Sequence, residues 1–209
     1  MGDILLTIAI PTLERRKTVF NELYNELKRQ SEPYGEKIEI ISVSDNGEMS
    51  IGNKRNLLNE MANGLYTVQW DDDDWISENG IELIMNGIES DVDVVCFNNF
   101  TDIEQWGKNR FFHKYVSLKY APPNQLIDYE NNIINCTPDQ KSVIKSSITK
   151  QVKFYDMNHG EDWFYMRDIL PFLHTEFYIN QFIYLYLNKA NESMDPYKRY
   201  KIEKSSKLI

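Results

Sequence analysis

The stretch Gly64-Leu65-Tyr66-Thr67-Val68-Gln69-Trp70-Asp71-Asp72-Asp73-Asp74-Trp75 is the most informative part of the chain. A predicted strand, Leu65 to Trp70, leads into four consecutive carboxylates, residues 71–74, which we call the aspartate run. Two unit charges 4 Å apart repel by roughly 4 kcal/mol at an effective dielectric near 20. A divalent cation removes this cost, because Mg²⁺ and Mn²⁺ prefer carboxylate and water oxygens. The alternative is a solvated acidic turn that caps the next helix, but the flanking aromatic residues and the preceding strand favour a metal site.

Composition indicates a single globular domain, residues 1–209, because 42% of the residues are hydrophobic. No apolar run approaches about 18 residues and no basic segment precedes one, so neither a membrane span nor a signal peptide is expected. The two cysteines, Cys96 and Cys136, are too few for a disulfide framework or a zinc site, and a cytoplasmic location is the simplest expectation. The net charge of −9 disfavours general binding to nucleic acid, although a local basic groove stays possible. The tail, residues 191–209, holds the one basic patch, which we interpret as solvated.

Residues 1–98 alternate strands and helices. We predict strands at 4–10, 38–44, 65–70 and 93–98, and helices at 14–30, 53–63 and 77–88, with Gly64 capping the second helix and Ser77 starting the third. This order predicts an α/β fold with a doubly wound, mostly parallel central sheet. Such sheets bind ligands beyond the carboxyl ends of their strands. Thr12, Asp45 and the aspartate run follow three strand ends, so we expect them to share one crevice.

Residues 99–190 have a different pattern and predict a smaller antiparallel and helical half. Phe100 to Tyr120 indicates antiparallel strands or loops. Further predicted elements are a helix at 138–148 started by Thr137 and Pro138, a helix at 161–170 ended by Pro171, and a late strand at 177–187.

Two sites outside the aspartate run carry charged groups suited to a phosphorylated ligand. Asp45, in Ser44-Asp45-Asn46-Gly47, can accept hydrogen bonds from a nucleobase imide or ribose hydroxyls, and an ordinary turn is an equal alternative. Lys54 and Arg55 are predicted at the start of a helix, where cations oppose the macrodipole. They therefore suit an anion such as a diphosphate, with a solvated basic turn as the alternative.

A second acidic pair, Glu161 and Asp162, lies in Asn158-His159-Gly160-Glu161-Asp162-Trp163. Acids in the first turn of a helix are favoured by its dipole, so capping is a serious alternative. A carboxylate directed into a crevice can instead take a proton from a hydroxyl as general base. His159 is a weaker candidate for this role.

Taken together, these motifs resemble a family 2 glycosyltransferase of the A-type fold, from Ile8 to about Tyr186. The resemblance rests on five elements in the right order: Ile10-Pro11-Thr12; Ser44-Asp45-Asn46-Gly47, where Asn46 replaces one acid; Lys54-Arg55-Asn56; Gly64-Leu65-Tyr66 leading into the aspartate run; and Gly160-Glu161-Asp162-Trp163 with Arg167. The Asp-x-Asp element alone is a weak motif.

The resemblance implies an inverting transferase that uses a nucleotide-diphosphate sugar, most often a UDP-sugar, and Mn²⁺ or Mg²⁺. Residues 1–98 would bind the nucleotide-sugar and residues 99–190 the acceptor. Asp162 would be the catalytic base, with Glu161 beside it. The metal would be held by Asp73, Asp71 and Asp74, in that order of preference, with Asp72 last. The donor residues would be Pro11, Thr12, Glu14, Asp45, Lys54, Arg55, Asp71 and Asp72. Weaker acceptor candidates are Trp106, His159 and Trp163, together with Arg110, Phe111, Phe112 and His113.

Two other functions share part of this pattern. A sugar nucleotidyltransferase would need a glycine-rich phosphate loop after the first strand, and Pro11-Thr12-Leu13-Glu14 contains no glycine. A calcium-binding module of the EF-hand type would need a glycine-centred loop of about 12 residues. For the acceptor, the acidic charge favours a saccharide or glycoconjugate slightly over the modified DNA bases of a virus.

Overall fold

The computed structural model describes residues 3–105, 108–120 and 126–186, with side chains omitted at 102–111. Trp106 and the basic tail at 191–209 therefore lie outside the described residues, as do the side chains of Arg110 and Phe111. Among the helices of the described part, none is long and apolar enough to span a lipid bilayer.

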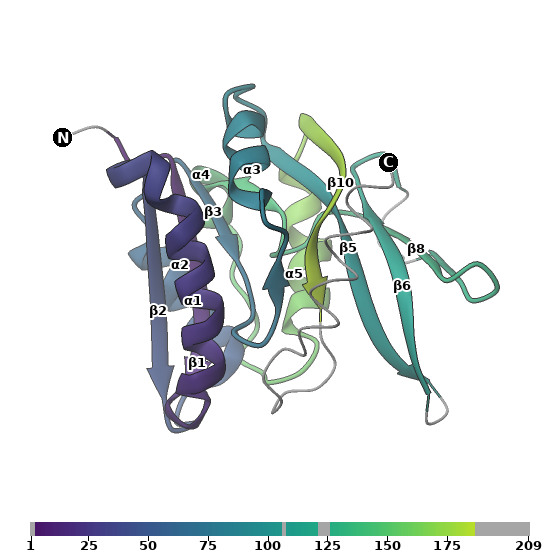
Figure 1. Ribbon diagram of the computed structural model, residues 1–209, viewed down its shortest axis with the longest axis horizontal. Coiled ribbons are helices and arrows are strands. Elements are labelled where there is room, and N and C mark those ends of the chain that lie inside the picture. The colour runs from purple at the N-terminus through teal and green to yellow at the C-terminus, as the bar shows by residue number, and fades with distance from the viewer. Residues whose placement is uncertain (1–2, 106–107, 121–125, 187–209) are drawn as a thin grey trace.

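All strands of the described residues join one ten-stranded sheet (Figure 1). The order is β2-β1-β3-β9-β5-β6-β8-β7, and β10 pairs with both β5 and β4. In chain order the strands are β1 (Leu6–Leu13), β2 (Ile38–Asp45), β3 (Tyr66–Gln69), β4 (Trp75–Ile76), β5 (Val94–Gln105), β6 (Lys108–Val116), β7 (Leu126–Asp128), β8 (Ile133–Cys136), β9 (Val143–Lys145) and β10 (Glu176–Tyr186). Strand β1 is parallel to β2 and β3, and β10 is parallel to β5. The predicted α/β class with a mostly parallel central sheet is confirmed.

Helices cover both faces of this sheet, as a doubly wound fold requires (Figure 1). Helices α1 (Lys17–Ser31) and α3 (Gly80–Ile88) pack on one face, and α2 (Ile51–Met61) and α5 (Glu161–Ile169) on the other. The remaining turns are α4 (Ser146–Thr149) and the short 3-10 segments Glu14–Arg16, Glu32–Lys37 and Leu170–Phe172.

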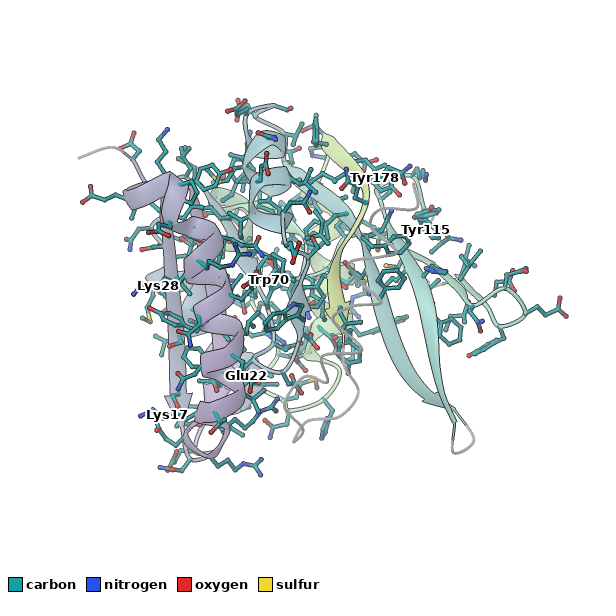
Figure 2. All side chains as sticks on the ribbon, in the orientation of Figure 1. Lys17, Glu22, Lys28, Trp70, Tyr115 and Tyr178 are labelled. Carbon is teal, nitrogen blue, oxygen red and sulfur yellow. The ribbon has the colours of Figure 1, made fainter. Side chains whose placement is uncertain are left out.

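Helix α1 shows how the apolar pattern positions a helix. Leu23 and Leu27 are buried against the sheet, whereas Lys17 and Lys28 point outward from the same helix (Figure 2). Gln30 then joins α1 to α3, because its amide donates to Ser77 O at 2.8 Å and accepts from Ile81 N at 3.1 Å. These two bonds fix α1 and α3 relative to each other on the same face of the sheet.

Two boundaries that differ from the sequence-based expectations have a clear structural reason. Strand β1 continues through Pro11, because pairing with β3 ends at Ala9 and the missing N–H of Pro11 breaks no further ladder bond on that side. Helix α3 begins at Gly80 rather than after Ser77, because β4 pairs with β10 and Ser77 N bonds to Ile183 O at 2.7 Å.

The predicted helix at 138–148 is wrong. Ser142 N bonds to Asp139 O at 3.0 Å in a turn, and β9 then inserts between β3 and β5 with Val143 and Ile144 buried. Gly64 does not cap α2, which ends at Met61 with Ala62 as its cap. A Cβ on Gly64 would lie 2.6 Å from Thr7 N, so glycine is needed there for close packing on β1.

Candidate active site

The aspartate run forms a turn between β3 and β4, closed by a bond from Asp74 N to Asp71 O at 3.3 Å. Because β4 separates this turn from α3, the alternative that the run caps the next helix is wrong. The turn borders a cavity of about 630 Å³, which we call the crevice, at the carboxyl ends of β1 and β3. Its lining includes Pro11, Thr12, Arg15, Arg16, Lys54, Arg55, Asp71, Asp72, Asp73, Lys141, His159, Glu161, Asp162 and Tyr186.

The four carboxylates of the run point to different partners. Asp71 pairs with Arg55 at 2.5 Å, whereas Asp72 accepts from the Thr12 hydroxyl at 2.5 Å. Asp74 lines no part of the crevice. It instead accepts a short hydrogen bond from the Tyr184 hydroxyl, which in turn accepts from Asp71 N at 3.2 Å.

Arg16 links two members of the run and was missed by the sequence analysis. Its guanidinium lies 2.7 Å from Asp72 and 2.7 Å from Asp73. The residue lies in the 3-10 turn directly after β1, and loops that follow a parallel strand are where such sheets build their sites. That position was the available signal.

Burial leaves part of the run short of compensating charge. It raises the pKa of Asp72 to about 6, with Thr12 and Arg16 acting against the rise and Asp73 and Asp71 adding to it. Burial and Asp71 likewise raise the pKa of Asp73. Burial, followed by Asp71 and Asp73, raises the pKa of Asp74 well above its usual range. At Asp71 burial also acts upward, but Arg55 and Lys141 outweigh it and lower the pKa.

Lys54 and Arg55 lie in the second turn of α2 rather than at its start, because Ser50 is the N-cap and accepts from Asn53 N at 3.1 Å. Both are buried and bonded to protein groups. Lys54 donates to Thr12 O at 2.7 Å and also pairs with Asp45. Lys54 therefore ties the end of β2 to the end of β1.

Asp45, at the end of β2, is the ion-pair partner of Lys54. Its carboxylate accepts from Gly47 N at 3.0 Å and Met49 N at 2.7 Å. Burial acts to raise its pKa, but Lys54 and these two N–H donors together lower it. The side chain is thus ionised and fixed beside the crevice, although it is not part of the lining.

Arg55 joins the aspartate run to α5. Its guanidinium is 2% exposed and bonds to Asp71 and, at 3.3 Å, to Glu161. Burial opposes its charge, but Asp71 and Glu161 outweigh that effect and raise its pKa. The same arginine therefore sets the position of one acid from each motif.

The start of α2 is also locked to the segment that precedes α5. Gly52 N bonds to Met157 O at 3.2 Å, and Ile51 N to the Asn158 amide oxygen at 3.0 Å. A Cβ on Gly52 would lie 1.8 Å from Tyr155 O, so only glycine permits this contact. Gly160, with φ of +81°, then turns the chain into α5.

Glu161 and Asp162 have different environments at the start of α5. Glu161 is 5% exposed and held by Arg55. Asp162 also lines the crevice but is only half-buried, and it forms no ion pair among the residues that the structure describes. One oxygen of its carboxylate accepts from Trp163 N at 2.8 Å, and the other has no hydrogen bond to the described residues. Asp162 is therefore the acid better placed to act on a bound molecule.

The other candidates are divided between the crevice and its surroundings. His159 lines the crevice, but Trp163, which is 43% exposed, does not, and neither does the exposed Glu14. Phe112 is buried in the sheet and contacts the Tyr129 ring edge-on, so packing explains it. His113 is exposed and lies against the Phe100 and Phe182 rings.

The crevice also contains Lys141, a second residue that the sequence analysis missed. Its ammonium lies 3.8 Å from Asp71 and 5.6 Å from the centre of the Tyr186 ring. Burial opposes its charge, but Asp71 and Asp139 outweigh that effect and raise its pKa. Lys141 was missed because the predicted helix at 138–148 did not place it at the end of a strand.

The oxygen-rich donor set suits a hard divalent cation. Asp71 and Asp73 line the same cavity, and the raised pKa of Asp73 indicates that its charge is incompletely neutralised. In the described ranges, no group of three or more His, Cys, Asp or Glu side chains is already arranged around a metal position. Cys96 and Cys136 are buried free thiols.

No protein-family model matches the sequence, and the comparison with curated proteins found no match. Solved structures are similar in fold. A structure of residues 1–349 of TarS from S. aureus has a TM-score of 0.59 and 13% identity, covering 95% of this chain and 69% of that one. The same fragment in complex with UDP-GlcNAc has a TM-score of 0.58 and 11% identity, with coverage of 95% and 64%.

A structure of TarS that extends beyond this fragment has a TM-score of 0.57 and 16% identity, with coverage of 95% of this chain. This chain spans only 38% of that TarS chain. At these identities the likeness establishes the fold alone. The chain therefore has the fold seen in the TarS fragment.

Proposed function

We propose that the protein transfers a sugar from a nucleotide-diphosphate sugar to an acceptor hydroxyl, with inversion at the anomeric carbon. The observation that carries this proposal is the crevice itself, where the aspartate run, three buried cations and the acids of α5 meet at the ends of parallel strands. Open α/β sheets bind nucleotides at this position. TarS, which has this fold, has been solved with UDP and with UDP-GlcNAc, which supports a UDP-sugar as donor.

The nucleoside would bind at the ends of β1 and β2. Pro11 and Thr12 line the crevice there, and Lys54 holds Asp45 next to them. Asp45 is ionised, so it can accept hydrogen bonds from a base imide or ribose hydroxyls. The diphosphate would then extend towards the aspartate run.

Charge balance supports a divalent cation as cofactor. Five acidic and five basic side chains line the crevice: Asp71, Asp72, Asp73, Glu161 and Asp162, and Arg15, Arg16, Lys54, Arg55 and Lys141. A diphosphate alone would leave this site strongly negative, whereas Mn²⁺ or Mg²⁺ with the diphosphate would nearly restore the balance. Asp73 and Asp71 would hold the ion. When bound, it would supply positive charge that favours departure of the nucleoside diphosphate.

Asp162 is the proposed general base. Asp162 lines the crevice, and its carboxylate would take the proton of an acceptor hydroxyl as the hydroxyl oxygen attacks the anomeric carbon. A single displacement from the face opposite the leaving diphosphate inverts the configuration, and the sugar passes through an oxocarbenium-like transition state. Glu161, held by Arg55, would position α5 without touching the substrate.

For the acceptor we propose a hydroxyl of a saccharide or glycoconjugate. The acidic chain would repel a DNA backbone, which argues against modified DNA bases. His159 is the candidate acceptor contact that lines the crevice.

The experiment compares wild-type protein with Asp162→Asn on UDP-, GDP- and dTDP-sugars in the presence of Mn²⁺. We expect the wild type to bind and slowly hydrolyse at least one donor. The variant should bind that donor with nearly unchanged calorimetric affinity and lose turnover by about 100-fold or more, the usual weight of a general base. Normal turnover in the variant would remove Asp162 from this role.

A further inference from the structure

We propose that Lys141 is the side chain that holds the leaving diphosphate, a role that the sequence analysis gave to Lys54 and Arg55. This inference rests on the proposed function, because it names a ligand of the same donor site. It begins from the bonding of four cations that line the crevice, the half-buried Arg16 and the buried Lys54, Arg55 and Lys141.

Three of these cations are already held by protein oxygens. Lys54 lies 2.7 Å from Thr12 O, Arg55 2.5 Å from Asp71, and Arg16 2.7 Å from both of its carboxylate partners. To bind a phosphate, Lys54 would have to break its pair with Asp45 or share its donors. The Arg55 nitrogen that has no partner among the described residues, Nη1, is shut off from solvent. Their geometry therefore fits a role in fixing the walls of the crevice.

Lys141 differs in its bonding. Its side chain is 8% exposed, and its ammonium makes no hydrogen bond to any residue in the described ranges. The nearest carboxylate oxygen, on Asp71, is 3.8 Å away, and that carboxylate already has Arg55 at 2.5 Å. An ammonium carries three N–H donors, and a buried donor without a partner costs stability unless a ligand takes it up.

The backbone around Lys141 is fixed beside the aspartate run. Lys141 N donates to the Asp139 carboxylate at 2.9 Å, and its carbonyl accepts from the Trp70 indole N–H at 3.2 Å. The neighbouring Gln140 O accepts from Gln69 N at 3.0 Å, so the segment is bonded to the end of β3. Trp70, labelled in Figure 2, is fully buried, so its bond to Lys141 O holds this segment to the core.

A second buried lysine holds Asp139 in turn. Lys114 donates to the other Asp139 oxygen at 2.9 Å, and Asp139 has a pKa of about 2, because Lys114 and Lys141 outweigh the effect of burial. The ionised Asp139 thus holds the Lys141 backbone in place and stabilises the charge of its side chain, which lines the crevice. Such preorganisation reduces the entropic cost of binding an anion.

The test measures calorimetric affinity for UDP and for UMP, both with Mn²⁺. UMP lacks the β-phosphate, which is the phosphate bonded to the sugar in the donor. The wild type should bind UDP more tightly than UMP. In Lys141→Met this preference should fall by about 10- to 100-fold, the worth of one charged hydrogen bond, while UMP affinity changes little. Lys141→Arg should keep most of the preference.

Lys145→Met is the matched control, because it removes the same charge outside the crevice. Lys145 ends β9, lies opposite Tyr66 at the start of β3, and pairs with Asp91. It should keep the full UDP preference. A Lys141→Met protein that keeps the wild-type preference overturns the inference and leaves the proposed function intact. A wild type that binds no nucleoside diphosphate overturns both.

A crystal structure of the wild type with UDP and Mn²⁺ gives an independent reading if the Lys141 variants fold poorly. The inference expects the ammonium about 3 Å from a diphosphate oxygen. A Lys141 ammonium beyond direct contact with the diphosphate would overturn it.

Discussion

Replacing Arg55 with methionine tests the buried ion-pair network that joins the aspartate run to α5. Arg55 is 2% exposed and bonds to Asp71 at 2.5 Å and Glu161 at 3.3 Å. Methionine fills much of the volume but leaves the buried Glu161 and the half-buried Asp71 without this partner. Removing one member of a buried pair costs about 3–5 kcal/mol, because the remaining charge stays desolvated. For a domain of this size that loss lowers Tm by roughly 6–20 °C.

The assay is urea unfolding followed by circular dichroism at pH 7.5. The control is Arg167→Met on α5. Arg167 is 45% exposed, and its contacts with Asp168, the Tyr155 hydroxyl and the Phe164 ring lie at the surface, so its loss should be nearly neutral. Adding Glu161→Gln to Arg55→Met should recover at least about 1 kcal/mol by removing one stranded charge. Arg55→Met and Arg167→Met proteins of equal stability would refute the network, as would a double variant less stable than Arg55→Met alone.

Three further substitutions test the charge of Asp72, the close contact at the start of α2, and the proposed metal ligand Asp73. The pKa of Asp72 in the folded protein, about 6, lies above its value in the unfolded chain, so ionisation of Asp72 lowers the stability as pH rises from about 4 to 6. Asp72→Asn should therefore raise the free energy of unfolding by on the order of 2 kcal/mol at pH 8. This gain should shrink towards pH 5. An equal effect at both pH values would contradict this. Gly52→Ala should cost about 3 kcal/mol in urea unfolding, because its Cβ would meet Tyr155 O at 1.8 Å, while the exposed Asn53→Ala on the same helix stays near neutral. Asp73→Ala should weaken nucleotide binding measured with Mn²⁺, and unchanged calorimetric affinity would count against Asp73 as a metal ligand.

The alternating half of the fold was predictable because each element carries a strong local signal. Apolar runs such as Ile4 to Ile10 identify parallel strands, and the stripe through Leu23 and Leu27 identifies α1. The late helix and strand, α5 and β10, were also confirmed within a residue or two. The segment at 138–148 failed because Pro138 and Thr137 imitate a helix start. Pairing of β9 with β3 and β5, which is a long-range contact, overrode that local signal.

Within the site, the sequence indicated which residues gather but not which bonds they make. Thr12, Arg55, Asp71 and Asp162 follow predicted strand ends or begin helices, so their convergence on one crevice was foreseeable. Arg16 and Lys141 were missed, because each reaches the aspartate run only through folding of a loop or turn. Likewise, spacing alone could not show that Tyr184, over a hundred residues away, directs Asp74 out of the crevice.

The most direct test of the proposed function identifies the phosphorus-containing product. The wild-type protein is incubated with Mn²⁺ and the donor that binds best, and the reaction is followed by ³¹P NMR. Sugar transfer or donor hydrolysis predicts that nucleoside diphosphate accumulates, with UDP as the expected species. Formation of pyrophosphate from a nucleoside triphosphate and a sugar phosphate would instead identify a nucleotidyltransferase, and Ca²⁺ binding without affinity for any nucleotide would contradict a donor site in the crevice.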